Sequence, residues 1–201
     1  SVNVSVDHFT CKKCNLTWAD YRAKTTENNP PREYCVYCEE KPTKYQKTKE
    51  IRVLKFLQQK FPNIQFVHNK NVGTHCSSKR KYPDIMIDLG THIVIIEIDE
   101  FQHSQYDIKC ENVRMYNIST ELGLSCVFIR FNPDTYKMKN AIKKIGEQIR
   151  LDLLKLQVQY HIDNIPDDWL TVEQLYYNCD CDACEHKHTT TLTLEQLKTY
   201  L

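Results

Sequence analysis

Two apolar segments separated by a short polar turn dominate the hydrophobic pattern in the middle of this chain. Residues 84–88 and 93–99 are mostly aliphatic, and this pattern predicts two β-strands joined in a hairpin. Asp84 opens the first segment, and Glu97 and Asp99 lie at the end of the second. Side chains two residues apart on a strand point the same way. We therefore expect Glu97 and Asp99 on one face, with Asp84 close to them across the hairpin.

The pattern on either side of this hairpin predicts an α/β core in the order helix, three strands, helix, strand, helix. The expected helices are 45–60, 107–122 and 138–160, and the expected strands are 64–67, 84–88, 93–99 and 125–131. On the last helix, the expected buried stripe is Ile142, Ile145, Ile149, Leu153 and Leu156. A length of 201 residues suits one domain with small appendages. We divide the chain into residues 1–42, a core of 43–162, and a C-terminal extension of 163–201.

The N-terminal unit contains two Cys-x-x-Cys pairs, a spacing typical of a structural zinc site. The four expected thiolate ligands are Cys11, Cys14, Cys35 and Cys38. A segment this short cannot bury enough apolar surface to fold alone, and zinc would supply the missing free energy. The alternative is a pair of redox or free Cys-x-x-Cys motifs. Whether such a finger contacts DNA or is purely structural is left open by the sequence.

The C-terminal extension is acidic and carries a second, less regular group of zinc ligands. The candidate ligands are Cys179, Cys181, Cys184, His186 and His188. Cys76 or His75 could complete the set from elsewhere in the chain. The alternative is a solvated loop whose thiols bind nothing.

Seven of the ten cysteines fall in short metal-like spacings and no apolar signal segment precedes them, which favours an intracellular protein over a secreted disulfide scaffold. No apolar run reaches the ~20 residues that span a bilayer, so no membrane association is expected. The net charge is +1, but residues 51–83 contain basic and no acidic side chains, whereas 163–186 show the reverse. This separation steers a polyanion to one face, or else the two segments pair with each other. Oligomeric state is not predicted.

The carboxylates at the hairpin predict a site for Mg²⁺ or Mn²⁺ that supports phosphodiester hydrolysis. Asp84, Glu97 and Asp99 supply the hard oxygen ligands that magnesium prefers, and the metal would activate water. His103 would transfer protons, with Asp107 to orient it.

Further residues around this site have candidate roles in binding the substrate. Arg114 would contact the phosphate or pair with the carboxylates, and Lys79, Arg80 and Lys81 would hold a phosphate backbone. Glu50 either points at the site or lies on the surface.

These residues resemble the PD-(D/E)xK nuclease superfamily and, within it, the Vsr-like branch of very-short-patch-repair endonucleases. The matching positions are Pro83-Asp84, Glu97-Ile98-Asp99 with Asp in place of the usual Lys, Gln102-His103, Asp107, Arg114 and Arg130-Phe131-Asn132. Glu97, Asp99, His103 and Asp107 are also similar to the EDxHD homing endonucleases, and hypothetical proteins of large DNA viruses carry similar segments. The resemblance covers residues 48–134 and implies a restriction-endonuclease-like core that cleaves DNA with a metal.

The function expected from the sequence is therefore a metal-dependent DNA endonuclease with zinc-binding units at both ends. RNA is not excluded as a substrate. The alternative is a catalytically inactive module of the same fold that binds nucleic acid or protein.

Overall fold

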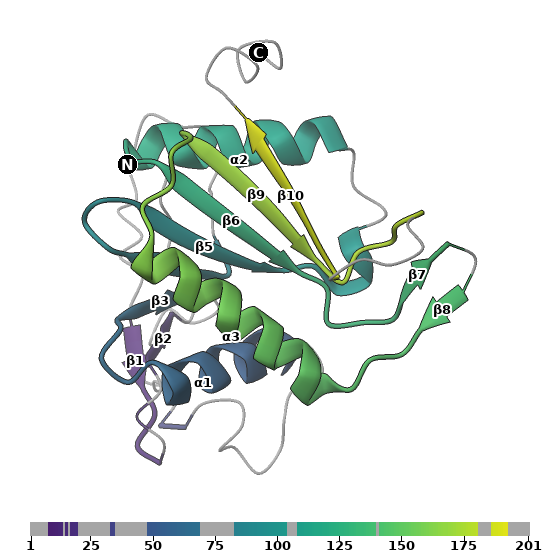
Figure 1. Ribbon diagram of the computed structural model, residues 1–201. Helices are drawn as coiled ribbons and strands as arrows, with labels where there is room; N and C mark the ends of the chain where they lie inside the picture. The colour runs from purple at the N-terminus through teal and green to yellow at the C-terminus, as the bar shows by residue number, and fades with distance from the viewer. Residues whose placement is uncertain are drawn as a thin grey trace.

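The computed structural model describes residues 8–13, 15, 17–19, 33–34, 48–68, 83–103, 108–139, 141–180 and 186–192. Among these residues, a six-stranded mixed sheet forms the centre, with helices on both faces (Figure 1). The strand order is β10-β9-β6-β5-β4-β3. The protein thus has the mixed α/β architecture that the sequence predicts.

The elements of the core follow the sequence-predicted order. They are helix α1 (Thr48–Lys60), strands β3 (Phe66–His68), β4 (Ile85–Asp88) and β5 (Ile93–Ile98), helix α2 (Ile108–Leu122), strand β6 (Cys126–Phe131) and helix α3 (Glu147–Asp163). A 3₁₀ segment, η1 (Glu100–His103), follows β5. Near the N-terminus, β1 (His8–Thr10) and β2 (Thr17–Ala19) form a separate antiparallel pair.

Strands β5 and β6 lie side by side in parallel at the middle of the sheet, and all twelve of their residues are buried. Full burial on both faces explains why their sequences are nearly continuous apolar runs. One apolar cluster lies between the sheet and helices α1 and α3 and includes Leu54, Ile96 and Leu154. A second lies between the sheet and α2 and includes Phe128 and Ile118.

The helix predicted over residues 138–160 begins later than expected. Residues before Glu147 instead form a short hairpin of β7 (Tyr136–Met138) and β8 (Ala141–Lys143), which extends away from the sheet (Figure 1). Main-chain bonds of Lys137 and Lys139 to Cys179 fix this hairpin to the C-terminal part of the chain. Gly146 then occupies the position before the first residue of α3.

The predicted buried stripe of α3 is correct only in part, because Ile145 and Leu153 pack against the core cluster and the other members do not. Ile149 and Leu156 are about three-fifths exposed, whereas Leu151, Leu154 and Val158 face the core. The helix carries apolar side chains around most of its circumference, so spacing alone does not select the buried face. The sheet selects it, because helix α3 must cover β5 and β6.

The sequence suggested that residues 163–201 form an extension outside the core, but two described segments of this region are strands of the central sheet. Strand β9 (Leu170–Leu175) pairs in parallel with β6, and β10 (Lys187–Leu192) pairs antiparallel with β9. The predicted boundary at residue 163 therefore divides a continuous sheet. Among the described residues, none of the helices combines the length and apolar composition needed to span a bilayer.

Candidate functional site

Three carboxylates meet at the edge of the sheet where the parallel strands β5 and β6 end. Glu97 belongs to β5, Asp99 directly follows it, and Asp84 directly precedes β4. The main-chain N–H of Ile98 donates a 2.9 Å hydrogen bond to Oδ2 of Asp84, which ties the start of β4 to the end of β5. All three carboxylates are at least nine-tenths buried. The structure thus brings together three residues that the sequence proposed as one site.

Two arginines from neighbouring elements contact these carboxylates. Arg114 of α2 donates from Nη2 to Glu97 Oε1 at 2.9 Å. Arg130, the register partner of Glu97 on β6, donates from Nε to Asp99 Oδ2 at 2.5 Å. The same guanidinium also donates to Glu111 Oε2 of α2 at 2.8 Å. Four carboxylates and two guanidinium groups of the described residues therefore share one region, on the α2 side of the sheet.

Burial and neighbouring negative charge strongly raise the pKa of Glu97. Burial, followed by the charge of Asp84 and then that of Asp99, raises the pKa of Glu97 to about 8, although Arg114 acts in the opposite direction. Because burial and the neighbouring carboxylates both oppose ionisation of Glu97, a cation added at this position would favour its ionised form. Acidic groups with such perturbed pKa values are typical of functional sites.

Tyr177 is a member of the site that the sequence analysis did not identify. Its hydroxyl donates a short hydrogen bond to Asp99 Oδ2. Burial, then the charge of Asp99, raises the pKa of Tyr177 far above its usual range, so the phenol remains a hydrogen-bond donor. Tyr177 received no role from the sequence because this residue follows β9, in the segment that was predicted to lie outside the core.

Arg130 was named from the sequence only as part of the family resemblance, without a role at the site, and Glu111 was not identified at all. Arg130 carried a visible signal: a charged residue inside the apolar strand 126–131, whose parallel partner is the strand that bears Glu97. Glu111 lies on α2 one turn before Arg114, so both side chains reach the same region. Reading charged residues on adjacent buried strands together would have identified Arg130.

The chemistry of the donors suits a hard divalent cation, since Asp84, Glu97 and Asp99 offer carboxylate oxygens at one sheet edge. The geometry is not that of a finished metal site. Within the described parts of the chain, no group of three or more His, Cys, Asp or Glu side chains is arranged to hold a metal ion. Arg114 and Arg130 instead contact two of the carboxylates directly.

Glu50 neither points at the carboxylate site nor lies on the surface, the two positions that the sequence allowed. Its Oε1 lies 2.6 Å from Nε2 of His68, and both side chains are buried. His68 pairs in register with Ile85, a member of the apolar cluster beneath α1 and α3. Glu50 and His68 therefore lie on the α1 side of the sheet, opposite the Arg114–Glu97 pair.

Several candidate site residues fall outside the described residues. They are Asp107, Lys79, Arg80, Lys81, Cys14, Cys35, Cys38, Cys181 and Cys184. His103 is described only as the last residue of η1. Their roles stay predictions.

Of the proposed zinc ligands, Cys11 is fully buried within the apolar cluster that includes α1. At the other end of the chain, His186 stacks on Tyr176 at 5.4 Å between ring centroids, and its Nδ1 lies 2.5 Å from the hydroxyl of Tyr136. His188 pairs in register with Gln174 on β10. These contacts do not test either predicted zinc site, because the other proposed ligands of each site lie mostly outside the described residues, and both zinc sites stay predictions.

Comparisons with protein-family models, with curated proteins and with solved structures found no match to this chain.

Proposed function

We propose that this protein is a divalent-metal-dependent nuclease that hydrolyses phosphodiester bonds in DNA, with a Vsr-like variant of the PD-(D/E)xK site and a restriction-endonuclease-like core. The observation that carries this proposal is the convergence of Asp84, Glu97 and Asp99 at the ends of β4 and β5. The helix–three strands–helix–strand–helix order supports it. Burying three carboxylates side by side is costly for stability, and a binding function for a cation would account for it.

In this proposal, Asp84 and Glu97 hold the metal, and Asp99 contributes through its second oxygen or through orientation. Bound Mg²⁺ or Mn²⁺ supplies positive charge for the phosphate and lowers the pKa of a water molecule. Arg130 and Tyr177 both donate a hydrogen bond to Oδ2 of Asp99 and so hold this carboxylate in position. Arg114 is about one-third exposed and therefore accessible to a phosphate group, unlike the more deeply buried Arg130.

A non-catalytic nucleic-acid- or protein-binding module is the second candidate function, and one observation favours it. The two arginines form ion pairs with Glu97 and Asp99, as they would in a purely structural cluster. The two candidates differ in what they predict for cleavage, because a structural cluster has no requirement for metal.

Incubating the full chain with plasmid DNA, single-stranded DNA and RNA, with Mg²⁺ or Mn²⁺ and with EDTA, separates these functions. We expect metal-dependent cleavage of DNA by the wild-type protein, and loss of cleavage in Asp84→Asn and Glu97→Gln. Asp88→Asn is the matched control, because Asp88 lies at the far end of β4 and is exposed, and its side chain accepts a hydrogen bond from the nearby N–H of Gly90. Cleavage that survives in the Asp84 and Glu97 variants would exclude this site as its source.

A further inference from the structure

A cavity lies at the same edge of the sheet as the three carboxylates, but on the opposite face of the sheet. It has a volume of about 230 Å³ and opens between the first turns of α1 and α3. Its apolar wall consists of Val53, Phe131, Pro133, Ile145 and Leu151. Its charged residues are Lys49, Arg52, Arg150 and Glu147. A cavity of this size holds several water molecules, and therefore has room for a phosphate group.

Arg150 is the feature that most clearly points to an anionic ligand. The side chain is only 3% exposed, yet it forms no ion pair with any carboxylate of the described residues. Its Nε donates to the carbonyl of Ile145, and its Nη1 donates to the carbonyls of Asn132 and Asp134. In the described part of the chain, the remaining nitrogen, Nη2, donates no hydrogen bond.

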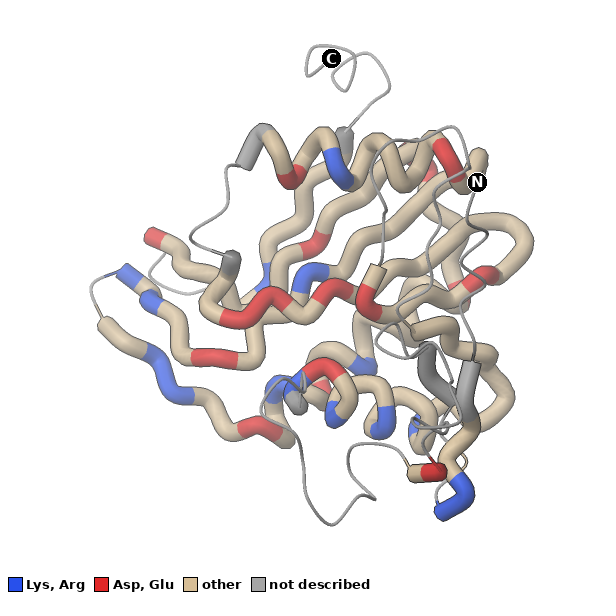
Figure 2. The backbone as a smooth tube through the Cα atoms, turned by 180° about the vertical axis from the view of Figure 1, so that it is seen from behind, with Lys and Arg blue, Asp and Glu red and all other residues tan. Residues whose placement is uncertain are grey.

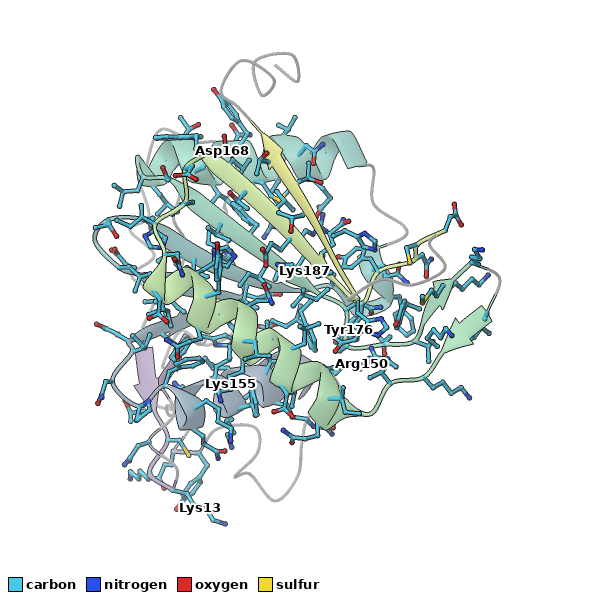
Figure 3. All side chains as sticks on the ribbon, in the orientation of Figure 1. Lys13, Arg150, Lys155, Asp168, Tyr176 and Lys187 are labelled. Carbon is cyan, nitrogen blue, oxygen red and sulfur yellow. The ribbon has the colours of Figure 1, made fainter. Side chains whose placement is uncertain are left out.

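The surroundings hold this guanidinium in a fixed position. It lies 5.2 Å from the ring centroid of Tyr176 and 6.0 Å from that of Tyr136. Figure 3 shows Arg150 and Tyr176 close together between α3 and the sheet. Burial lowers the pKa of Arg150, a sign that its charge is costly there. A buried and oriented guanidinium is suited to a phosphate, because its planar donor groups match phosphate oxygens.

The other basic groups of the cavity lie nearer to solvent. Lys49 Nζ contacts Asp134 Oδ1 at 2.6 Å and Glu100 Oε2 at 3.4 Å. Arg52 and Glu147 lie 3.4 Å apart and are both more than half exposed, so this pair contributes little to stability. An incoming phosphate could take the place of Glu147 beside Arg52. The first turn of α3 also borders the cavity, and Gly146 provides no side-chain cap for its N–H groups.

Two contacts connect the cavity to the carboxylate site. The side chain of Phe131 lines the cavity, and its carbonyl accepts a 2.9 Å hydrogen bond from the N–H of Asp99. Lys49, at the cavity, contacts Glu100, the residue after Asp99. A strand that passes over this edge of the sheet would therefore meet the carboxylates on one face and the cavity on the other.

The hairpin beside the cavity favours an extended polyanion over a small one. Strands β7 and β8 and the residues after them carry Lys137, Lys139, Lys143 and Lys144, and Ile142 between them is 64% exposed. No acidic residue occurs from 135 to 146. Figure 2 shows basic segments on this hairpin and along α1. A free phosphate would contact the cavity alone, whereas a nucleic-acid strand would contact both the cavity and the basic hairpin.

We propose that the cavity formed by Lys49, Arg52 and Arg150 binds a backbone phosphate of the nucleic-acid strand, next to the one at the carboxylate site. This assignment rests on the proposed nuclease function for the identity of the strand. It assigns the α1 and α3 side of the sheet edge to substrate binding and gives Arg150 the role of a phosphate ligand.

The test measures binding without cleavage, by anisotropy of a short fluorescein-labelled DNA duplex with the full chain in EDTA. We expect Arg52→Gln to weaken binding about three- to tenfold, and the double variant Lys49→Gln with Arg52→Gln to weaken it further. Each lost phosphate contact should reduce the slope of log K against log salt by about 0.9. Arg150→Gln should weaken binding most, provided that its thermal melting shows a folded protein.

The matched control is the double variant Lys60→Gln with Lys155→Gln, which removes the same charge from α1 and α3 outside the cavity. It should bind with wild-type affinity and slope. Equal losses in control and cavity variants, or wild-type binding by the Arg52 and Lys49 variants, would overturn the assignment. A third result would also overturn the assignment: inorganic phosphate or adenosine monophosphate stabilises the wild-type protein but not the cavity variants, while all of them bind the duplex equally. The cavity would then bind a small phosphate ester.

Failure of this assignment is distinguishable from failure of the nuclease proposal. If the cavity variants lose binding but the wild-type protein cleaves no substrate with metal, the cavity assignment stands and the nuclease proposal falls. If the wild-type protein cleaves DNA and the cavity variants bind it unchanged, the nuclease proposal stands and the cavity assignment falls.

Discussion

Replacing Glu97 by glutamine should make the metal-free protein more stable at high pH and change the pH dependence of its stability. Glu97 is 3% exposed and lies beside two further carboxylates, Asp84 and Asp99. Glutamine has nearly the same shape but resembles only the protonated form of the side chain. The variant therefore isolates the free energy that the protein loses when Glu97 ionises.

The magnitude follows from the pKa. A rise from 4.5 to about 8, at about 1.36 kcal/mol per pH unit, corresponds to about 5 kcal/mol. The folded state binds this proton more tightly than the unfolded state does. The stability that the proton provides is therefore complete below pH 4.5 and declines as pH rises, until Glu97 ionises in the folded protein near pH 8.

Urea denaturation in EDTA at about pH 5 and about pH 9 measures this difference for the wild type and for Glu97→Gln. We expect the stability of the variant relative to the wild type to increase by several kcal/mol between these pH values. Saturating Mg²⁺ should reduce the increase, because the cation favours ionised Glu97. Asp88→Asn should show no comparable change. A relative stability of Glu97→Gln that is the same at both pH values would refute the reasoning about mutual repulsion.

Three further predictions concern the core, the thiols and zinc. Leu154→Ala should cost about 2–5 kcal/mol of unfolding free energy, whereas Leu156→Ala on the same helix should cost about 0.5 kcal/mol or less, measured by urea denaturation. Burial raises the pKa of Cys126 to about 12, so iodoacetamide at neutral pH should alkylate exposed Cys110 and leave Cys126 unmodified in the folded protein, as mass spectrometry would show. Elemental analysis of the purified full chain should find about two zinc ions, and their absence would contradict both predicted zinc sites.

The sequence predicted the strands of the core well, because buried parallel strands such as 93–98 and 126–131 leave no ambiguity in the hydrophobic pattern. It failed on β9 and β10, whose sequences contain Thr, Glu and Lys between fewer apolar residues. Their place in the sheet is fixed by pairing with β6 and with each other, which is information from tertiary structure.

The candidate site was predictable to the extent that its residues belong to one hairpin. Asp84, Glu97 and Asp99 are brought together by strands adjacent in sequence. Tyr177 and Arg130 reach Asp99 only because β6 and β9 lie next to β5 in the sheet, an order that periodicity does not provide. Glu50 shows the opposite case: its position on α1 was predicted, but its pairing with His68 was not.

Binding of Mn²⁺ to the full chain, measured by electron paramagnetic resonance of the free ion, tests most directly whether the carboxylates form a metal centre. Titrations should be run on the wild type, Asp84→Asn, Glu97→Gln and the control Asp88→Asn. We expect the wild type and the control to bind about one or two Mn²⁺ ions that Asp84→Asn and Glu97→Gln do not bind. Equal binding by all four proteins, or no binding by the wild type, would contradict a metal-dependent nuclease at this site.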